Sequence, residues 1–228
     1  MEEYYSNKLS AEKLRKCYEI ATPAIRKYLN SELNYVLKKI NQGDSVLELG
    51  CGYGRILPFL AVKAGQVVGI DTSMPSIEMG RNMLSRYPNV SLLQMNAVNL
   101  KFEDNTFNAV VCLQNGISAF HVNRVNLIKE SIRVTKPGGV ILFSSYSVKF
   151  WNERLEWFKL QSMEGLIGEI DYSKTKNGFI LCKDGFSVST VGPKEFKALV
   201  SGIRNIRITV TEVDKSSIFC EIITDKHK

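Results

Sequence analysis

The chain has 228 residues, a length that suits one large α/β domain. Hydrophobic residues make up 44% and charged residues 23%, a globular composition that excludes extended disorder. No apolar run approaches the roughly 18 residues of a membrane span, and the acidic, aromatic start, residues 1–5, does not resemble a secretory signal. We therefore expect a cytoplasmic protein without a membrane partner.

The net charge of +7 is spread along the chain. Basic and acidic residues number eight and five in residues 1–43, ten and seven in 44–150, and twelve and eleven in 151–228. A phosphate-binding surface normally shows clustered charge, so we do not expect a nucleic-acid partner. The five cysteines are far apart, none forms a CxxC pair, and only two histidines occur, so we expect neither a structural metal nor a disulfide framework.

The first 43 residues read as helical. Ser10 is a candidate N-cap for a first helix, and Thr22-Pro23 supplies the N-cap and first residue of a second. An apolar stripe continues to Ile40, and Gly43 ends the pattern. We expect residues 1–43 to form an N-terminal helical cap.

From Asp44 the pattern changes to short apolar strands that alternate with helices. Strands are expected at 45–49, 67–70, 90–94, 108–113 and 140–144, with helices near 55–64, 74–86 and 124–135. Strands that are almost entirely apolar indicate a sheet covered on both faces, and their alternation with helices indicates parallel βαβ units. Residues 44–144 are thus expected to form a doubly wound core.

The pattern loosens after Tyr146. We expect an aromatic-rich helix over 150–158, a hairpin at Asn177-Gly178, a short helix from Gly192-Pro193, and strands at 206–213 and 217–224. The fold class is therefore α/β, with a mostly parallel seven-stranded sheet, helices on both faces and an antiparallel last strand. Residues 145–192 are expected to form a lid-like insert that contacts the substrate, and residues 193–228 to complete the same domain.

The segment most indicative of chemistry is a strand, a G-x-G-x-G loop and a helix, over residues 46–55. The glycines allow a sharp turn and a close approach of the backbone to a ligand. Asp71 ends the second strand, where an acidic side chain accepts hydrogen bonds from both hydroxyls of a ribose. This pattern fits a dinucleotide or another adenosine cofactor.

Two residues favour the second alternative. Arg55 stands where the nicotinamide fingerprint requires a third glycine. Glu48 precedes the glycines and would repel a pyrophosphate, but it suits a cationic ligand that carries an amino-acid group. S-adenosylmethionine is such a ligand.

The sequence resembles the class I S-adenosylmethionine-dependent methyltransferases over residues 44–146, which implies a Rossmann-like methyltransferase fold. The matching segments are ELGCGYG at 48–54, GIDTS at 69–73, NAVNLKF at 96–102 and KPGGV at 136–140. The resemblance implies cofactor binding by a set of residues in these motifs and after the fourth strand: Glu48, Gly50, Cys51, Gly52, Gly54, Arg55, Asp71, Thr72, Ser73, Met74, Asn96, Ala97, Leu113 and Gln114.

The sequence also departs from the family pattern. Asn96 replaces the usual aspartate beside the adenine, so that contact would be neutral. An Asn-Pro-Pro-Tyr motif, typical of methylation of base and glutamine amino groups, is absent, and Gln114-Asn115-Gly116 stands in its place. This difference argues against those acceptors.

Several residues have a second, structural interpretation. The glycine loop and Asp71 also suit a plain tight turn, Ser73 suits a helix N-cap, and Met74 suits the core. His121 and Tyr146 are candidate catalytic residues because both follow strands at the carboxyl edge, although a lone histidine near a helix start is more often structural.

Asn115, Tyr146 and Trp151 are the candidate substrate residues. Trp151 lies on a helix with aromatic residues on two faces, which either covers the site, packs in the core or forms a dimer contact. Tyr4, Tyr5 and Tyr18 are expected to fold over the cofactor.

The resemblance implies an S-adenosylmethionine-dependent methyltransferase that transfers a methyl group to a small-molecule acceptor by in-line displacement. The alternatives are an RNA or protein methyltransferase and a non-catalytic cofactor-binding protein of the same fold. The chain is expected to be a monomer or a homodimer.

Overall fold

The computed structural model describes residues 4–225. Residues 1–3, on which the expectation about a leader partly rests, lie outside this range, as do residues 226–228. The N-terminal elements are η1 (Tyr4–Lys8), α1 (Ala11–Glu19) and α2 (Pro23–Leu37). The central elements are β1 (Ser45–Leu49), α3 (Leu57–Ala61), β2 (Gln66–Asp71), α4 (Met74–Met83), β3 (Val90–Gln94), β4 (Phe107–Cys112), α5 (Gly116–Ala119), α6 (Arg124–Val134) and β5 (Thr135–Tyr146). The remaining elements are η2 (Val148–Phe150), α7 (Trp151–Met163), β6 (Ile180–Leu181), β7 (Ser187–Val188), α8 (Pro193–Val200), β8 (Ile206–Val213) and β9 (Ser217–Thr224).

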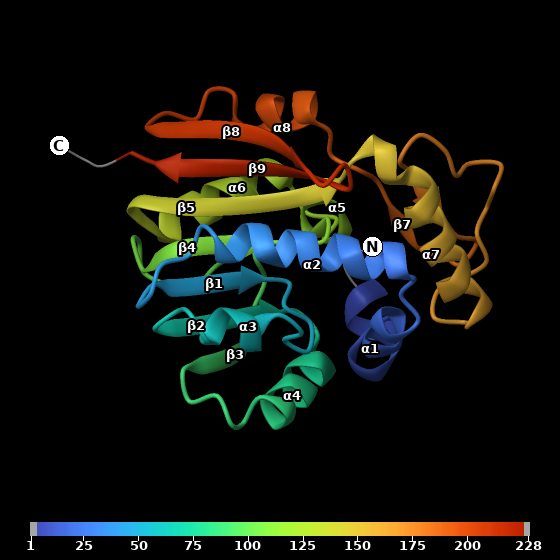
Figure 1. Cartoon of the computed structure of the whole chain (residues 1–228), viewed down its shortest axis with the longest axis horizontal. Helices are drawn as coiled ribbons and strands as arrows, with labels where there is room; N and C mark the ends of the chain where they lie inside the picture. The colour runs from blue at the N-terminus through green and yellow to red at the C-terminus, as the bar shows by residue number, and fades with distance from the viewer. Residues whose placement is uncertain (1–3, 226–228) are drawn as a thin grey trace.

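Seven strands form one sheet in the order β3-β2-β1-β4-β5-β9-β8. Strands β1 to β5 pair in parallel, whereas β9 runs antiparallel to both of its neighbours. In Figure 1 the parallel strands point toward the side of the molecule that carries α1 and α7, and β9 points the other way. The predicted α/β fold, with a mostly parallel seven-stranded sheet and an antiparallel last strand, is confirmed.

Helices cover both faces of the sheet, because its central strands are apolar on both sides. One core joins the sheet to α6 and α8 through residues such as Leu127 and Phe196. The other joins it to α2, α3 and α4 through residues such as Val36, Leu57 and Ile77. Each fully buried side chain of this size contributes about 1.5–3 kcal/mol relative to an exposed one.

A third core lies beyond the carboxyl ends of the parallel strands. It joins α1, the first half of α2, α7 and the segment 166–188, and it is rich in aromatic side chains. Helix α2 links this core to the sheet, since Tyr28 packs in the third core and Val36 packs against the strands. The N-terminal helices and the segment after β5 are thereby held at one end of the sheet.

The structure tests the predicted helix N-caps and adds two short helices. Thr22 is the N-cap of α2, and its side chain accepts a hydrogen bond from the Ile25 amide, as predicted. Ser10 precedes α1 without a side-chain cap bond. The sequence did not indicate η1 or the four-residue α5, since both are too short to show periodicity.

The hairpin turn at Asn177-Gly178 is present, and both residues adopt positive φ angles, of 51° and 84°. Lys176 and Phe179 exchange two backbone hydrogen bonds across it. The flanking segments pair again at an antiparallel bridge between Ile170 and Cys182, and Ile180–Leu181 also pairs with Ser187–Val188.

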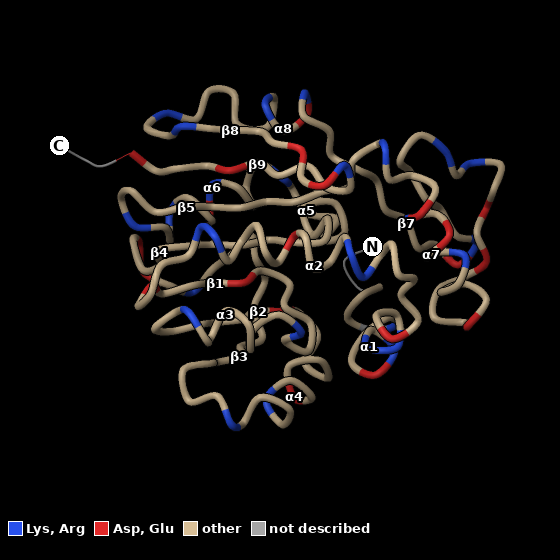
Figure 2. Tube along the Cα trace, viewed as in Figure 1, with Lys and Arg blue, Asp and Glu red and all other residues tan. Residues whose placement is uncertain are grey.

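Charges are interspersed along the chain, and Figure 2 shows basic and acidic residues in every layer. Within residues 4–225, no helix has both the length and the apolar composition needed to cross a membrane.

Candidate active site

A cavity of about 370 Å³ lies at the carboxyl ends of the parallel strands. In open α/β sheets this edge is where ligands bind. The loops after β1, β2, β3 and β4 form one part of its wall, and η1, α1, β5 and α7 form the other. The structure thus brings the predicted cofactor motifs together with segments that precede and follow them in the chain.

The glycine loop after β1 turns at positive φ angles. Gly50 and Gly52 have φ values of 70° and 55°, a region that favours glycine. A Cβ atom on Gly50 would lie 2.4 Å from the Phe120 ring, and one on Gly52 would lie 2.7 Å from the Leu14 side chain. The loop therefore needs glycine both for its backbone geometry and for the close packing of the cavity wall.

Asp71 ends β2 and fixes the glycine loop. Its two carboxylate oxygens accept hydrogen bonds from the Gly52 amide at 2.9 Å and the Ser73 amide at 2.8 Å. Burial raises the pKa of Asp71, and these amides oppose the rise. An ionised carboxylate has about four acceptor positions, so Asp71 retains capacity for two hydroxyl donors in the cavity.

Glu48 and Arg55 place a carboxyl group and a guanidinium group in the cavity wall. Glu48 is 6% exposed, and burial raises its pKa to about 8, while the Arg55 guanidinium opposes this rise. Glu48 Oε2 and Arg55 Nη2 are both buried without a hydrogen-bond partner. Such atoms are normally bonded, so this part of the cavity suits a ligand that carries both a cation and an anion.

The loops after β2 and β3 supply another part of the wall, with Thr72, Asn96 and Ala97. Asn96 Oδ1 accepts a hydrogen bond from the Val98 amide at 3.0 Å. Three predicted cofactor residues lie outside the cavity wall: Gly54, Ser73 and Met74. Ser73 is the N-cap of α4, and Met74 is 37% exposed.

The end of β4 has an unusual backbone. Leu113, Gln114 and Asn115 all line the cavity, and the last two have positive φ angles of 52° and 65°. Two hydrogen bonds fix Gln114. Its backbone amide donates to Glu32 Oε2 at 3.2 Å, and its side-chain Oε1 accepts from the Tyr18 hydroxyl at 2.5 Å.

The side chain of Asn115 is engaged in structural hydrogen bonds. Its Nδ2 donates to the Ser189 carbonyl at 2.7 Å, and its Oδ1 accepts from the Ser145 hydroxyl at 2.7 Å. Asn115 therefore fastens the segment after β5 to the end of β4.

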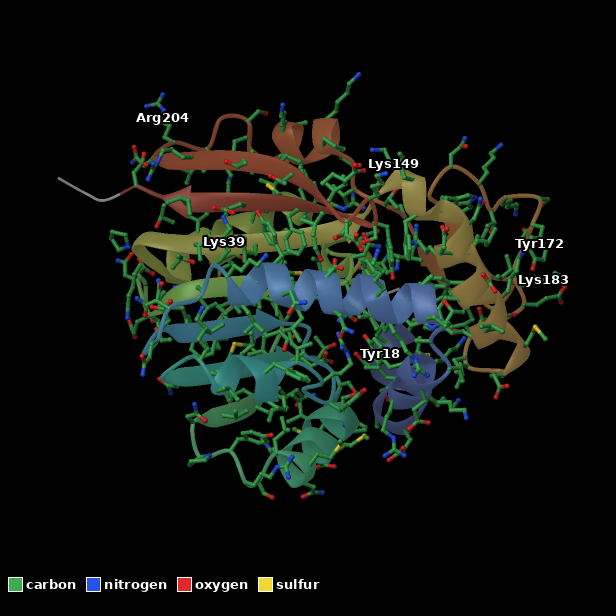
Figure 3. All side chains as sticks on the ribbon, viewed as in Figure 1. Tyr18, Lys39, Lys149, Tyr172, Lys183 and Arg204 are labelled. Atoms are coloured by element: carbon green, nitrogen blue, oxygen red, sulfur yellow. The ribbon has the colours of Figure 1, made fainter. Side chains whose placement is uncertain are left out.

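A group of aromatic and apolar side chains forms another part of the cavity wall. We call them the acceptor wall, and they are Tyr5, Leu9, Cys17, Tyr146, Trp157 and Phe158. The Trp157 indole donates to the Cys17 carbonyl at 2.9 Å and thus joins α7 to α1. Figure 3 shows Tyr18, at the end of α1, close to the loops that follow the strands.

The candidate catalytic residue His121 and the candidate substrate residue Trp151 also lie outside the cavity wall. His121 makes a hydrogen bond of 2.8 Å through Nε2 to the Ser187 carbonyl. Trp151 packs near Arg154, whose guanidinium carbon is 6.0 Å from the Trp151 ring. Lys183 pairs with Glu169 and projects from the outer rim of the segment that follows α7 (Figure 3).

Sequence reasoning missed several residues of the wall. Gln161 and Val188 belong to no motif, and Phe120 and Val122 flank the histidine that was singled out. Helical spacing was the one available signal for Gln161, because it lies three residues after Phe158 on α7.

Within the described residues, no group of three His, Cys, Asp or Glu side chains is arranged to hold a metal ion. All five cysteines are buried free thiols.

Comparison with known proteins finds similarity over the central part of the chain. Residues 46–139 match the family model of a methyltransferase domain. The chain is 31% identical over 121 residues to a demethylmenaquinone methyltransferase of Staphylococcus epidermidis, a match that covers 51% of this chain and 47% of that protein. The chain thus spans about half the length of this relative. A demethylmenaquinone methyltransferase of Bacillus licheniformis is 26% identical, with 75% of each chain covered.

Solved structures share the fold. A protein from Pyrococcus horikoshii OT3 aligns with a TM-score of 0.67 at 21% identity and 99% coverage of both chains. A SAM-dependent methyltransferase from Methanosarcina mazei aligns with a TM-score of 0.62 at 21% identity, over 85% of this chain and 98% of that one. The glycine loop and the acid that ends β2 both lie in the segment that matches the methyltransferase-domain model, and the chain has the fold of a solved SAM-dependent methyltransferase.

Proposed function

We propose that this chain binds S-adenosylmethionine in the cavity and transfers its methyl group to a small-molecule acceptor by in-line displacement. The observation that carries the proposal is the pair of buried, unpartnered atoms Glu48 Oε2 and Arg55 Nη2 in one cavity wall. The amino-acid part of the cofactor carries an ammonium and a carboxylate, and these two side chains match it in charge. Ion pairs and charge-assisted hydrogen bonds of this kind are the strong ones.

The remaining cofactor contacts follow from the same loops. Asp71 has free acceptor capacity for the two ribose hydroxyls, and Gly50 and Gly52 line the cavity beside it. Asn96 and Ala97 are available to the adenine. We carry over Cys51, Thr72, Leu113 and Gln114 as further cofactor contacts, since all four line the cavity.

The bound cofactor supplies a methyl group that is already activated by a positive sulfur. The protein therefore has two main tasks, to align the acceptor and to exclude water. Alignment of two reactants contributes up to about 7–11 kcal/mol. The acceptor wall serves both tasks, because its aromatic side chains line the cavity and pack in the core beyond the strand ends.

A small-molecule acceptor is favoured by the size and composition of the cavity. Ligand pockets in this size range are mostly apolar with a few polar groups, as is the acceptor wall. Two of the relatives are named for methylation of demethylmenaquinone, a small molecule. We assign acceptor selection to residues 145–192 together with η1 and α1, and cofactor binding to residues 44–115.

The test is a search for methyl transfer with methyl-labelled S-adenosylmethionine. Wild type and Asp71→Ala are incubated in parallel with a small-molecule metabolite extract, with total RNA and with a protein extract. Label in a small molecule, with wild type alone, is the expected result. Label in RNA or protein contradicts the small-molecule proposal, and cofactor binding without any transfer supports a non-catalytic protein.

A further inference from the structure

Helix α7 contributes one side-chain amide to the cavity wall, that of Gln161. We propose that Gln161 selects the methyl acceptor through a hydrogen bond to one of its oxygen atoms, and that the acceptor is an uncharged, mostly apolar ring compound that carries this oxygen. The inference deepens the proposed function and rests on it, because it names the class of molecule that receives the methyl group.

Gln161 lies on the side of α7 that faces the cavity. It follows Trp157 by four residues and Phe158 by three, so it lies next to both on the surface of the helix. All three residues line the cavity. Trp157 fixes this side of α7 toward α1, since its indole donates to the Cys17 carbonyl at 2.9 Å. Gln161 therefore lies beside two aromatic residues of the acceptor wall.

The Gln161 side chain is buried but has no hydrogen-bond partner in the protein. The residue is 3% exposed. Its amide makes no hydrogen bond with any other described residue, and neither amide atom is fully enclosed by protein. Polar atoms of a buried residue that remain accessible in a cavity wall are accessible from the cavity. Buried polar groups normally have a partner, so this amide suits a ligand that supplies one.

The amide of Asn115, in the same cavity wall, differs in this respect. Its nitrogen donates to the Ser189 carbonyl and its oxygen accepts from the Ser145 hydroxyl, both at 2.7 Å. The protein thus uses both polar atoms of Asn115, whereas those of Gln161 are free. A glutamine amide offers N–H donors and an acceptor oxygen, which together suit the hydroxyl group of a ligand.

The backbone around Gln161 is fixed by hydrogen bonds at the end of α7. The Gln161 carbonyl accepts from the Leu166 amide at 2.9 Å, and the Ser162 hydroxyl donates to the Gly168 carbonyl at 3.0 Å. These bonds join the end of the helix to the segment that follows it. A polar group on a fixed backbone loses less freedom when a ligand binds, which favours selective recognition.

The charges of the cavity favour an uncharged acceptor. Among the described residues that line it, the charged ones are Glu48, Arg55 and Asp71, all on the cofactor side. Arg154 lies behind the acceptor wall, with its guanidinium carbon 4.5 Å from the centroid of the Tyr146 ring, but it is fully buried and does not line the cavity. An ionised group in this part of the cavity would lose its hydration without contacting an opposite charge, which is costly.

The test compares 2-naphthol with naphthalene, two probes that differ by one hydroxyl group and are both uncharged at neutral pH. The full-length protein is saturated with S-adenosylhomocysteine, and dissociation constants are measured from the fluorescence of each probe. Gln161→Met keeps the length of the side chain but removes its amide. The variant should bind 2-naphthol about tenfold more weakly than wild type, or about 1.4 kcal/mol, and its affinity for naphthalene should change less than about twofold.

Two further variants separate loss of the hydrogen bond from loss of packing. Phe158→Leu is the matched control, because Phe158 lines the same wall from the same helix and has no polar side-chain atom. It should weaken the binding of both probes by a similar factor. Gln161→Leu should repeat the result of Gln161→Met, and circular dichroism verifies that each variant is folded.

The remaining outcomes would overturn the inference. An equal loss for both probes in the Gln161 variants, or no loss for 2-naphthol, contradicts the role of Gln161. Tighter binding of 2-naphthoate than of 2-naphthol by wild type contradicts an uncharged acceptor and would implicate Arg154. Failure of both probes to bind a wild-type complex that does bind S-adenosylhomocysteine also overturns the inference. Absence of S-adenosylhomocysteine binding by wild type, measured by calorimetry, contradicts the proposed function instead.

Discussion

The two parts of the cavity are assembled from different kinds of sequence. The cofactor side comes from loops that each follow directly on a parallel strand, and its polar groups lie within a few residues of a strand end. The acceptor wall joins residues as far apart as Tyr5 and Phe158, and aromatic packing holds them together. The end of each strand fixes the position of the cofactor-side residues that follow it. The positions of the acceptor-wall residues depend instead on how α1 packs against α7. Substitutions in the two parts should therefore have separable effects.

The largest effect is expected from Gly52→Val. The substitution places a branched side chain against Leu14 at a backbone φ of 55°, in the cavity wall. We expect a loss of at least about a hundredfold in affinity for S-adenosylhomocysteine, or about 2.8 kcal/mol, by calorimetry. Gly43→Val is the matched control, because Gly43 has a φ of 84° but no neighbouring atom within 4 Å of an added Cβ. Equal loss in both variants would assign the effect to backbone strain rather than to the ligand site.

Asp71→Ala should weaken cofactor binding by a comparable amount. Each hydrogen bond to a charged group contributes about 1.5–3 kcal/mol, and the substitution removes those to the ribose together with the bonds that fix the Gly52 and Ser73 amides. Asp104→Ala, which removes an exposed partner of Arg133, controls for the loss of a charge. Unchanged affinity in Asp71→Ala would show that the ribose binds elsewhere.

Glu48→Gln should change stability in a pH-dependent way. Burial raises the folded-state pKa of Glu48 to about 8, above the unfolded value of 4.5, so the unfolded state loses its proton first. The wild-type protein therefore loses stability relative to the variant as pH rises from 4.5 to 8. At pH 7 the free energy of unfolding of the variant should exceed that of wild type by on the order of 3 kcal/mol. This difference vanishes below pH 4.5. Urea unfolding at several pH values measures this difference in the free energy of unfolding. A difference that does not change with pH would contradict a raised pKa of Glu48 in the folded protein.

The smallest effect on cofactor affinity is expected from Tyr146→Phe. The phenyl ring preserves the packing against Tyr28, so affinity for S-adenosylhomocysteine should change less than about twofold, below 0.5 kcal/mol. Turnover should change more than cofactor affinity does, since the Tyr146 hydroxyl is lost from the cavity wall. Trp151→Ala, outside the cavity wall, should lower the melting temperature more than it changes turnover. A large loss of cofactor affinity in Tyr146→Phe would show that the cofactor side and the acceptor wall do not have separate functions.

The same distinction explains what the sequence predicts. The strands, the glycine loop and Asp71 follow from local periodicity and spacing, and the structure places them as expected. Glu32 gave no signal, because a buried carboxylate on an amphipathic helix is recognised only once the helix packs against β4 and β5. His121 was singled out for its residue type, but backbone geometry directs it to the Ser187 carbonyl, outside the cavity wall. Prediction from sequence therefore succeeds for loops that follow strands and fails for contacts between distant segments.

The most direct test of the account is a crystal structure of the protein with S-adenosylhomocysteine. We predict that the amino-acid part of the ligand lies between Glu48 and Arg55 and that the ribose hydroxyls bind Asp71. The sulfur should point toward Tyr146 in the acceptor wall. A ligand in the reverse orientation, or outside this cavity, would contradict the assignment of the two parts.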